Sequence, residues 1–176
     1  METKIFNVKS HLSDEEFLDW KSRLEQILLL SQLRYYKEKK LIAERQKFDS
    51  KILGTLCLDE EIPEEIWKNY PPNKKYLISS FGRVKYDNKI VPQKDEEGKI
   101  GYLILDDEIF GTKLLKYYTY QMVAVTFLTK PNEGEYHIHH ISNNGYDNSV
   151  GNLIYLSKDQ HKIVHEIENK YRNKWS

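Results

Sequence analysis

The stretch YHIHHISNNGYDNSVGNLIYLSKDQHKIVHE, residues 136–166, decides the fold of this chain. Residues 136–141 combine β-branched, aromatic and histidine side chains, and the Ser-Asn-Asn-Gly cluster that follows them is a strong turn signal. Residues 153–156 form a second apolar run of strand length. Ser157 stands three residues before Gln160, in the pattern of a capping box that begins a helix. The stretch therefore predicts a strand, a loop, a second strand and a helix.

Five of the six histidines in the chain lie in this stretch, and His11 lies far from it. Four of the five, all except His137, are candidates for a shared site. The four are His139, His140, His161 and His165. The last two are four residues apart, so a helix directs both rings from one face. Imidazoles that share a divalent metal must converge on it at about 2.0–2.1 Å. Neighbouring strand residues point to opposite sides, so one of the adjacent pair can join the helical pair while the other faces a substrate.

The histidine that faces the substrate is a candidate general base. A neutral imidazole with an ordinary pKa near about 6.5 suits proton removal from water at neutral pH. Its second ring nitrogen must be held by a hydrogen bond that fixes the tautomer. Asn152 is the candidate for this orienting contact, and His137 and His11 are expected to stay outside the cluster.

This block resembles the HNH endonucleases, whose ββα-metal (His-Me finger) core has the same order of elements. The residues that carry the resemblance to the homing and phage branch are His139, His140, Ile141, Asn144, Asn148, Val150, Asn152 and Leu153. The resemblance implies that His139 binds metal, that His140 is the general base and that Asn152 orients it. His161 and His165 resemble the two helical metal ligands of the colicin DNase branch.

The resemblance implies a metal-dependent DNA endonuclease that hydrolyses phosphodiester bonds with a single divalent ion. The family often works with Mg²⁺ in the cell, whereas three imidazoles also suit Zn²⁺, Mn²⁺ or Ni²⁺. Two alternatives stay open. One is a catalytically silent DNA-binding or regulatory protein on an HNH frame. The other is a structural zinc-binding interaction module, which would need a fourth ligand and would leave Asn152 without a role.

A second segment resembles NUMOD4, the short module that precedes the core in homing-type HNH enzymes. Its best match is ISSFGRV at residues 78–84, which predicts a strand, a glycine kink and another strand. Strands over residues 101–105 and 116–120 would complete a small antiparallel sheet. A helix over residues 120–127 then leads into the core. It begins with Tyr-Gln, where the family often carries His-Arg, and the resemblance as a whole covers about residues 64–169.

Basic side chains on these β elements are the candidates for contacts with the DNA backbone. Arg83 is expected to be the best single phosphate contact. The full set is Arg83, Lys85, Lys74, Lys75 and Lys116.

The first part of the chain predicts helix. Ser13 and Glu16 form another capping box, and apolar residues then recur at three- and four-residue steps without interruption by glycine or proline. A helix or helical pair over residues 14–50 is expected. The apolar patch at residues 28–33 favours a homodimer, but a helix folded onto its own domain explains it equally well.

The acidic, proline-containing segment at residues 59–66 predicts a boundary. Three regions follow: a helical one at 1–60, a NUMOD4-like β segment with an entry helix at 61–130, and the HNH core at 131–176. The expected fold class is α+β, with a small antiparallel sheet and a ββα-metal core behind a long amino-terminal helical segment.

Composition restricts the other possibilities. The 176 residues hold 27 basic and 27 acidic side chains, so the net charge is zero and gives no support for nucleic-acid binding. No apolar run approaches the roughly 20 residues of a membrane span, and the amino terminus lacks the apolar core of a signal peptide. The single cysteine, Cys57, excludes an internal disulfide. A cytoplasmic protein is expected.

Overall fold

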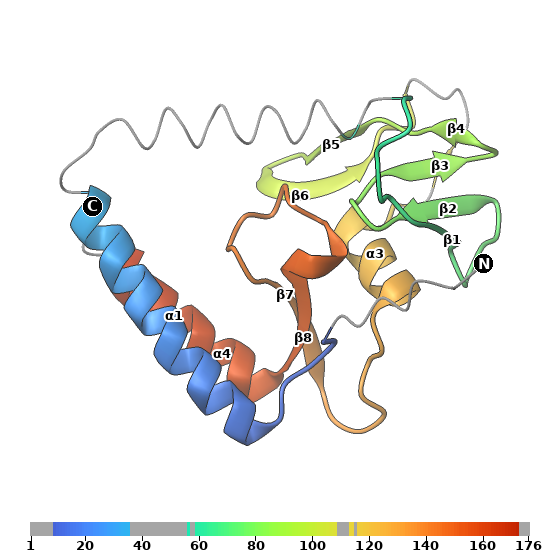
Figure 1. Cartoon of the computed structure of the whole chain (residues 1–176). Helices are drawn as coiled ribbons and strands as arrows, with labels where there is room; N and C mark the ends of the chain where they lie inside the picture. Colours follow the sequence, from blue (N-terminus) through green and yellow to red (C-terminus); the bar gives the residue numbers. More distant parts are fainter. Residues whose placement is uncertain (1–8, 36–55, 57–58, 109–112, 115, 173–176) are drawn as a thin grey trace.

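The computed structural model describes residues 9–35, 56, 59–108, 113–114 and 116–172 (Figure 1). Its elements are α1 (Asp14–Tyr35), β1 (Trp67–Asn69), β2 (Tyr76–Ser79), β3 (Val84–Tyr86), β4 (Lys89–Ile90), β5 (Gln93–Glu96), β6 (Lys99–Leu105), α3 (Thr119–Phe127), β7 (Tyr136–His140), the 3₁₀ turn η1 (Val150–Asn152), β8 (Leu153–Ser157) and α4 (Lys158–Arg172). The predicted α+β class is confirmed, with small antiparallel sheets and helices.

Helix α3 lies between the β1–β4 sheet and the β7–β8 hairpin (Figure 1). Buried apolar side chains of all three parts form one core cluster. They include Met122, Val123 and Ala124 of α3, Ile78 and Val84 of the sheet, and Val150, Leu153 and Tyr155 of η1 and β8. Since burial of apolar surface is the main favourable contribution to folding, this shared core fixes the hairpin relative to the sheet.

In the described part of the chain, the strands form three separate antiparallel sheets. β1, β2, β3 and β4 pair in that order, β5 pairs with β6, and β7 pairs with β8. The connection between β2 and β3 contains Gly82 with φ of 85°, a left-handed conformation that favours glycine. The predicted strand, glycine kink and strand at residues 78–84 are therefore confirmed.

The two strands predicted after this sheet have different outcomes. The strand over residues 101–105 is confirmed as part of β6. The strand over residues 116–120 is wrong, because Tyr118 makes one isolated bridge to β6 and α3 begins at Thr119. The Tyr118 carbonyl accepts a hydrogen bond from the Met122 amide at 3.2 Å, so the chain already turns into the helix there.

Helix α1 runs along α4 and covers its apolar face (Figure 1). The predicted capping box is present: the Ser13 amide donates to Glu16 Oε2 at 2.9 Å, and the Glu16 amide donates to Ser13 Oγ at 3.3 Å. Phe17 is buried in a cluster with Val164 of α4 and with two residues of β8. The described part of α1 thus packs onto its own chain.

The predicted helix over residues 14–50 is described as far as Tyr35. Residues 36–55 and Cys57 lie outside the described residues, and so do the side chains of the apolar patch at residues 28–33. Dimerisation through this region stays a prediction, as does the division into three domains. In the ranges that the structure describes, no helix is long and apolar enough to cross a membrane.

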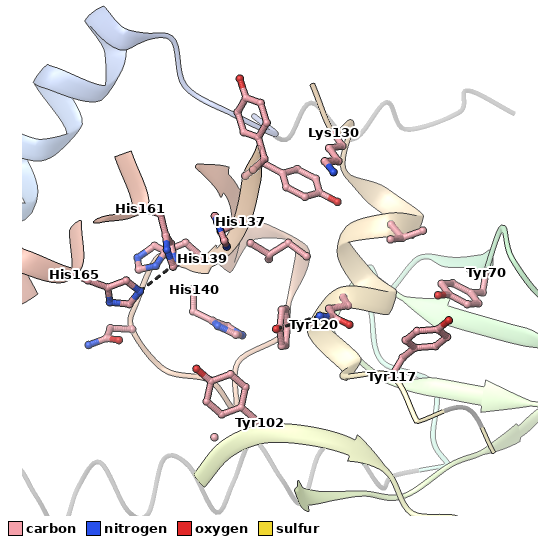
Figure 2. A pocket seen from close by; sticks show the side chains of 18 of the residues that line it. Tyr70, Tyr102, Tyr117, Tyr120, Lys130, His137, His139, His140, His161 and His165 are labelled. Atoms are coloured by element: carbon pink, nitrogen blue, oxygen red, sulfur yellow. Dashed lines mark hydrogen bonds between the residues drawn. The ribbon is translucent and has the colours of Figure 1, made fainter. Parts of the chain in front are cut away.

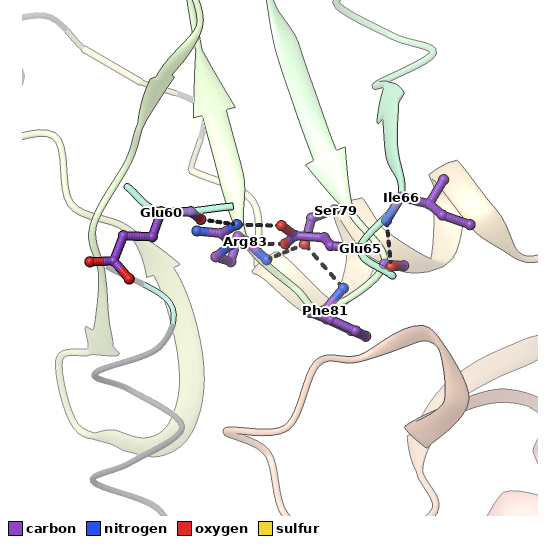
Figure 3. Close-up of polar contacts among 7 residues, drawn as sticks. Glu60, Glu65, Ile66, Ser79, Phe81 and Arg83 are labelled. Carbon is purple, nitrogen blue, oxygen red and sulfur yellow. Dashed lines mark hydrogen bonds and ion pairs between the residues drawn. The ribbon is translucent and has the colours of Figure 1, made fainter. Parts of the chain in front are cut away.

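Arg83 is buried, and the expectation that it contacts phosphate is wrong. Only 2% of the residue is exposed. Its guanidinium forms an ion pair with Glu65, with Nε donating to Oε1 at 2.8 Å, and Nη2 donates to the Glu60 carbonyl oxygen at 2.9 Å (Figure 3). The Glu65 carboxylate is as deeply buried as its partner. The arginine therefore fastens residues 60–65 to the β2–β3 turn rather than facing a ligand.

The four lysines of the predicted DNA-binding set have different surroundings. Lys74, Lys75 and Lys116 are exposed. Lys85 is partly buried, and its Nζ lies 4.3 Å from the centroid of the Trp67 ring. Contact of these lysines with DNA stays a prediction.

Replacement of Arg83 by alanine should leave the Glu65 carboxylate buried without its cation. Loss of one partner from a buried ion pair costs about 3–5 kcal/mol, so the free energy of unfolding in urea should fall by about that amount. Lys74→Ala, at an exposed lysine of the same region, is the matched control and should change stability by less than about 0.5 kcal/mol. Equal stability of the two variants would contradict a structural role for the Arg83–Glu65 pair.

Candidate active site

The β7–β8 hairpin and the start of α4 set the positions of the histidines. β7 and β8 pair in antiparallel register from Tyr136 opposite Ser157 to His140 opposite Leu153. The predicted capping box is confirmed, with the Ser157 amide donating to Gln160 Oε1 at 3.1 Å and the Gln160 amide donating to Ser157 Oγ at 3.3 Å. Helix α4 therefore begins directly after β8 and returns along the hairpin (Figure 1).

His139, His161 and His165 meet between β7 and α4 (Figure 2). One nitrogen from each ring lies within 4.8 Å of the others, and the Nε2 atoms of His161 and His165 are 3.1 Å apart. His139 is 4% exposed, and its Nε2 is buried without a hydrogen-bond partner among the described residues. Because a buried polar atom is normally satisfied, these three nitrogens fit a divalent metal ion. Binding of the ion itself stays a prediction.

The surroundings keep His139 and His161 neutral, which is the form that binds metal. Burial, and then the neighbouring rings of His161, His165 and His140, lower the pKa of His139 to about 3. Burial, His165 and His137 lower the pKa of His161 to about 4. These two rings can therefore bind a metal at neutral pH without losing a proton.

Glu168 is a part of the site that the sequence analysis missed. The residue is 3% exposed, its Oε2 lies 3.2 Å from His165 Nδ1, and its Oε1 lies 3.7 Å from His139 Nε2. The negative charge of the carboxylate beside Nδ1 favours the tautomer with the proton on Nδ1 and the lone pair on Nε2, which faces His161. The spacing of the three residues on α4, at positions i, i+4 and i+7, was a signal that the sequence contained.

His137 lies against the cluster without being part of it, as expected from the sequence. Its ring stacks on the ring of His161, with centroids 4.9 Å apart and an angle of 12° between the planes. The alternation of side chains along β7 places His137 on the same side as His139. His137 does not belong to the group of three whose nitrogens converge. His11 forms a bridge with Tyr155 of β8 and does not belong to the converging group either.

His140 projects from the other side of β7, as predicted. Its Nε2 lies 2.7 Å from Asn148 Oδ1, and the edge of its ring meets Tyr120 at 5.3 Å between centroids (Figure 2). Because the amide oxygen is an acceptor, Nε2 carries the proton and Nδ1 keeps the lone pair. Burial lowers the pKa of His140, and the hydrogen bond that His140 donates to Asn148 and the charge of Asp147 act in the opposite direction.

The predicted contact between Asn152 and His140 is wrong. Asn152 Nδ2 donates to the Asp147 carbonyl at 2.7 Å, and its Oδ1 accepts from the Ser142 amide at 2.8 Å. Asn152 thus closes the loop between β7 and β8, and that loop carries Asn148 to His140. The sequence could not decide between the two asparagines, because the choice depends on how the loop folds.

The metal-site histidines and His140 open into one cleft. The cavity has a volume of about 750 Å³, and its wall includes His139, His140, His161 and His165 (Figure 2). The side chain of His165 is 49% exposed there, and a water or a phosphate oxygen can therefore approach the triad from the cleft. One solvent-accessible pocket therefore contains His140, with a nitrogen that can accept a proton, and three histidines that could bind a cation.

No family model and no curated protein matches the sequence. A solved structure described as "DNA binding and cleavage by the HNH homing endonuclease I-HmuI" is similar in fold, with a TM-score of 0.41 and 18% sequence identity. The match covers 62% of this chain and 59% of that chain. Because the TM-score is below 0.5, a functional assignment has to rest on the geometry of the site.

Glu168→Gln should weaken metal binding by about 10- to 100-fold, because the amide cannot hold the His165 tautomer as the carboxylate does. Affinity is measured by competition with a chelating dye for Zn²⁺ or Co²⁺. Glu166→Gln is the matched control, since Glu166 lies on the same helix with 64% of its side chain exposed. Equal affinities of the two variants would exclude this role for Glu168.

Proposed function

We propose that the protein is a metal-dependent endonuclease of the HNH type. The observation that carries the proposal is the division of two adjacent imidazoles on β7 between two tasks. His139 turns toward the helical pair His161 and His165, and His140 turns toward the opposite wall of the same cleft. General-base hydrolysis next to a bound cation requires this combination.

His140 is the proposed general base. Its Nδ1 takes a proton from a water molecule that is in line with the scissile phosphorus, while Asn148 holds Nε2 on the other side of the ring. His139, His161 and His165 would hold one divalent ion, Mg²⁺ in the cell or Zn²⁺, Mn²⁺ or Ni²⁺. When bound, the ion supplies Lewis-acid stabilisation of the charge that develops on the phosphate oxygens.

DNA is the proposed substrate. Lys74, Lys75, Lys85 and Lys116 are the proposed contacts to its phosphates, on a NUMOD4-like segment that precedes the core. The chain has no net charge, so affinity depends on this local set of cations and should fall steeply as salt concentration rises.

A structural zinc site fits the geometry less well. Such a site is normally closed by four protein ligands, whereas three nitrogens converge in the described part of the chain. The half-exposed His165 borders the cleft, as expected for a site that exchanges a ligand with solvent. Cleavage of DNA in the presence of divalent ions distinguishes an enzyme from a catalytically silent DNA-binding protein.

With supercoiled plasmid and a series of divalent ions, the parent protein should produce nicked or linear DNA. His140→Ala should lower the rate by at least about 100-fold, because the proton acceptor is lost. Metal content and DNA binding in a mobility-shift assay should remain at parental values, since His140 belongs to neither set of contacts. Cleavage by His140→Ala at the parental rate would refute the assignment of the base, and a parent inactive with every ion would refute the enzyme.

The pH dependence of cleavage should identify His140 further. The neutral ring is the active form, so the rate rises with pH and reaches half its maximum below about pH 6.5, since burial lowers the pKa of His140. Asn148 raises that pKa, so Asn148→Ala should move the midpoint to lower pH and also reduce the maximal rate. Asn152→Ala should leave the midpoint closer to the parental value. Identical midpoints in the parent and the Asn148 variant would contradict the contact.

A further inference from the structure

The walls of the cleft are rich in tyrosine. The tyrosines that line it are Tyr70, Tyr102, Tyr117, Tyr120, Tyr136 and Tyr155. Among the described residues of the lining, Lys130 is the single lysine or arginine, and neither aspartate nor glutamate occurs. Aromatic faces, rather than charges, therefore dominate the surface that a substrate meets beside His140.

A series of tyrosine rings in contact with one another leads to the proposed base. Tyr118 and Tyr120 are stacked, with centroids 5.5 Å apart and an angle of 16° between the planes. Tyr102 on β6 lies 5.7 Å from the first ring and 6.3 Å from the second. Tyr120 in turn meets His140 (Figure 2). Tyr102 is 44% exposed, so part of this aromatic surface is open to a ligand.

Lys94 on β5 and Lys99 on β6 are paired with carboxylate or tyrosine hydroxyl groups. Lys99 Nζ lies 2.7 Å from Glu96 Oε2 and donates to the Tyr118 hydroxyl at 2.7 Å. Lys94 pairs with Asp106 and Glu108 at 3.1 and 3.0 Å. A duplex presents phosphates on its outside and hides the faces of its bases, so this side of the cleft suits a duplex poorly.

The strand that carries Tyr102 is fastened to the loop that carries Asn148. The Tyr146 hydroxyl donates to Asp95 Oδ2 at 2.8 Å, and the Gly101 amide donates to Asp95 Oδ1 at 2.7 Å. Gly145 lies so close to Gly101 that a Cβ on Gly145 would be 2.0 Å from the Gly101 carbonyl oxygen. The position of Tyr102 relative to His140 is therefore fixed by backbone contact.

We propose that the cleft binds an unpaired base next to the scissile phosphate, and that Tyr102 stacks on it. The inference rests on the proposed nuclease function and specifies its substrate as single-stranded DNA or a duplex with unpaired bases at the cut. Stacking of bases on aromatic side chains is the usual way in which proteins bind single strands. A volume of about 750 Å³ lies in the range of pockets that enclose a small ligand, so the cleft has room for one nucleotide.

The test uses His140→Ala protein with metal, so that substrates bind without being cut. Three DNA molecules of one sequence are compared: a single strand, a perfect duplex and a duplex with a central unpaired segment. Each carries 2-aminopurine, whose fluorescence falls on stacking. The single strand and the unpaired duplex should bind at least about tenfold more tightly than the perfect duplex, with quenching at one position.

Tyr102→Ala in the same protein should weaken binding of the single strand by about tenfold or more and abolish the quenching, whereas Tyr102→Phe should retain both. Phe81→Ala is the matched control, because Phe81 is 37% exposed and does not line the cleft. Thermal unfolding of each variant shows whether the fold is intact. Retention by Tyr102→Phe together with loss in a folded Tyr102→Ala protein supports stacking.

Two results separate this inference from the proposed function. If the parent cuts perfect duplex as fast as single strand, and Tyr102→Ala cuts both at the parental rate, the inference is wrong and the nuclease remains. If the parent cuts none of the three DNA molecules with any divalent ion, the nuclease is wrong, and Tyr102-dependent quenching alone would then support a protein that binds unpaired bases.

Discussion

The pairing of β7 with β8 is the constraint on which the site depends. In an antiparallel ladder, neighbouring side chains leave on opposite faces, and the register from Tyr136 to His140 is continuous. His137 and His139 therefore contact α4, while His140 contacts Tyr120 of α3. A slip of one residue would exchange the two faces, so the histidine triad and the placement of His140 in the cleft would be lost together. Residues on both faces of β8 are buried, so such a slip would force each side chain into packing shaped for another.

Local patterns in the sequence were sufficient for much of this arrangement. Both capping boxes, the glycine kink at Gly82 and the convergence of the helical histidines with His139 depend on neighbours within a few residues or on the regular alternation of a strand. Tyr118 shows the limit of such patterns. The aromatic and β-branched residues around it have the composition of a strand, but the Tyr118 carbonyl accepts the first hydrogen bond of a helix. The helix forms there because its buried face packs into the core.

Contacts between distant parts of the chain were not predictable from the sequence. An arginine such as Arg83 is a common contact for phosphate. Its actual partners become clear only from the position of residues 60–65 in the fold. The roles of Asn148 and Asn152 depend on the fold of a loop that has no periodicity. Glu168 is a different case, since its helical spacing from His165 was visible. A search for charged residues one turn beyond a ligand pair would have found it.

The packing of α1 on α4 has a consequence for how the molecule can be divided. Phe17 and its neighbours cover Ile154, Leu156 and Val164, which belong to the strand and helix of the histidine site. The ring of Trp20 also lies edge-on to His139 at 6.3 Å between centroids. A shortened protein that begins after the amino-terminal helix would expose this apolar surface to water and would tend to aggregate. Work on an isolated histidine core therefore has to retain α1 or substitute polar residues for the side chains beneath it.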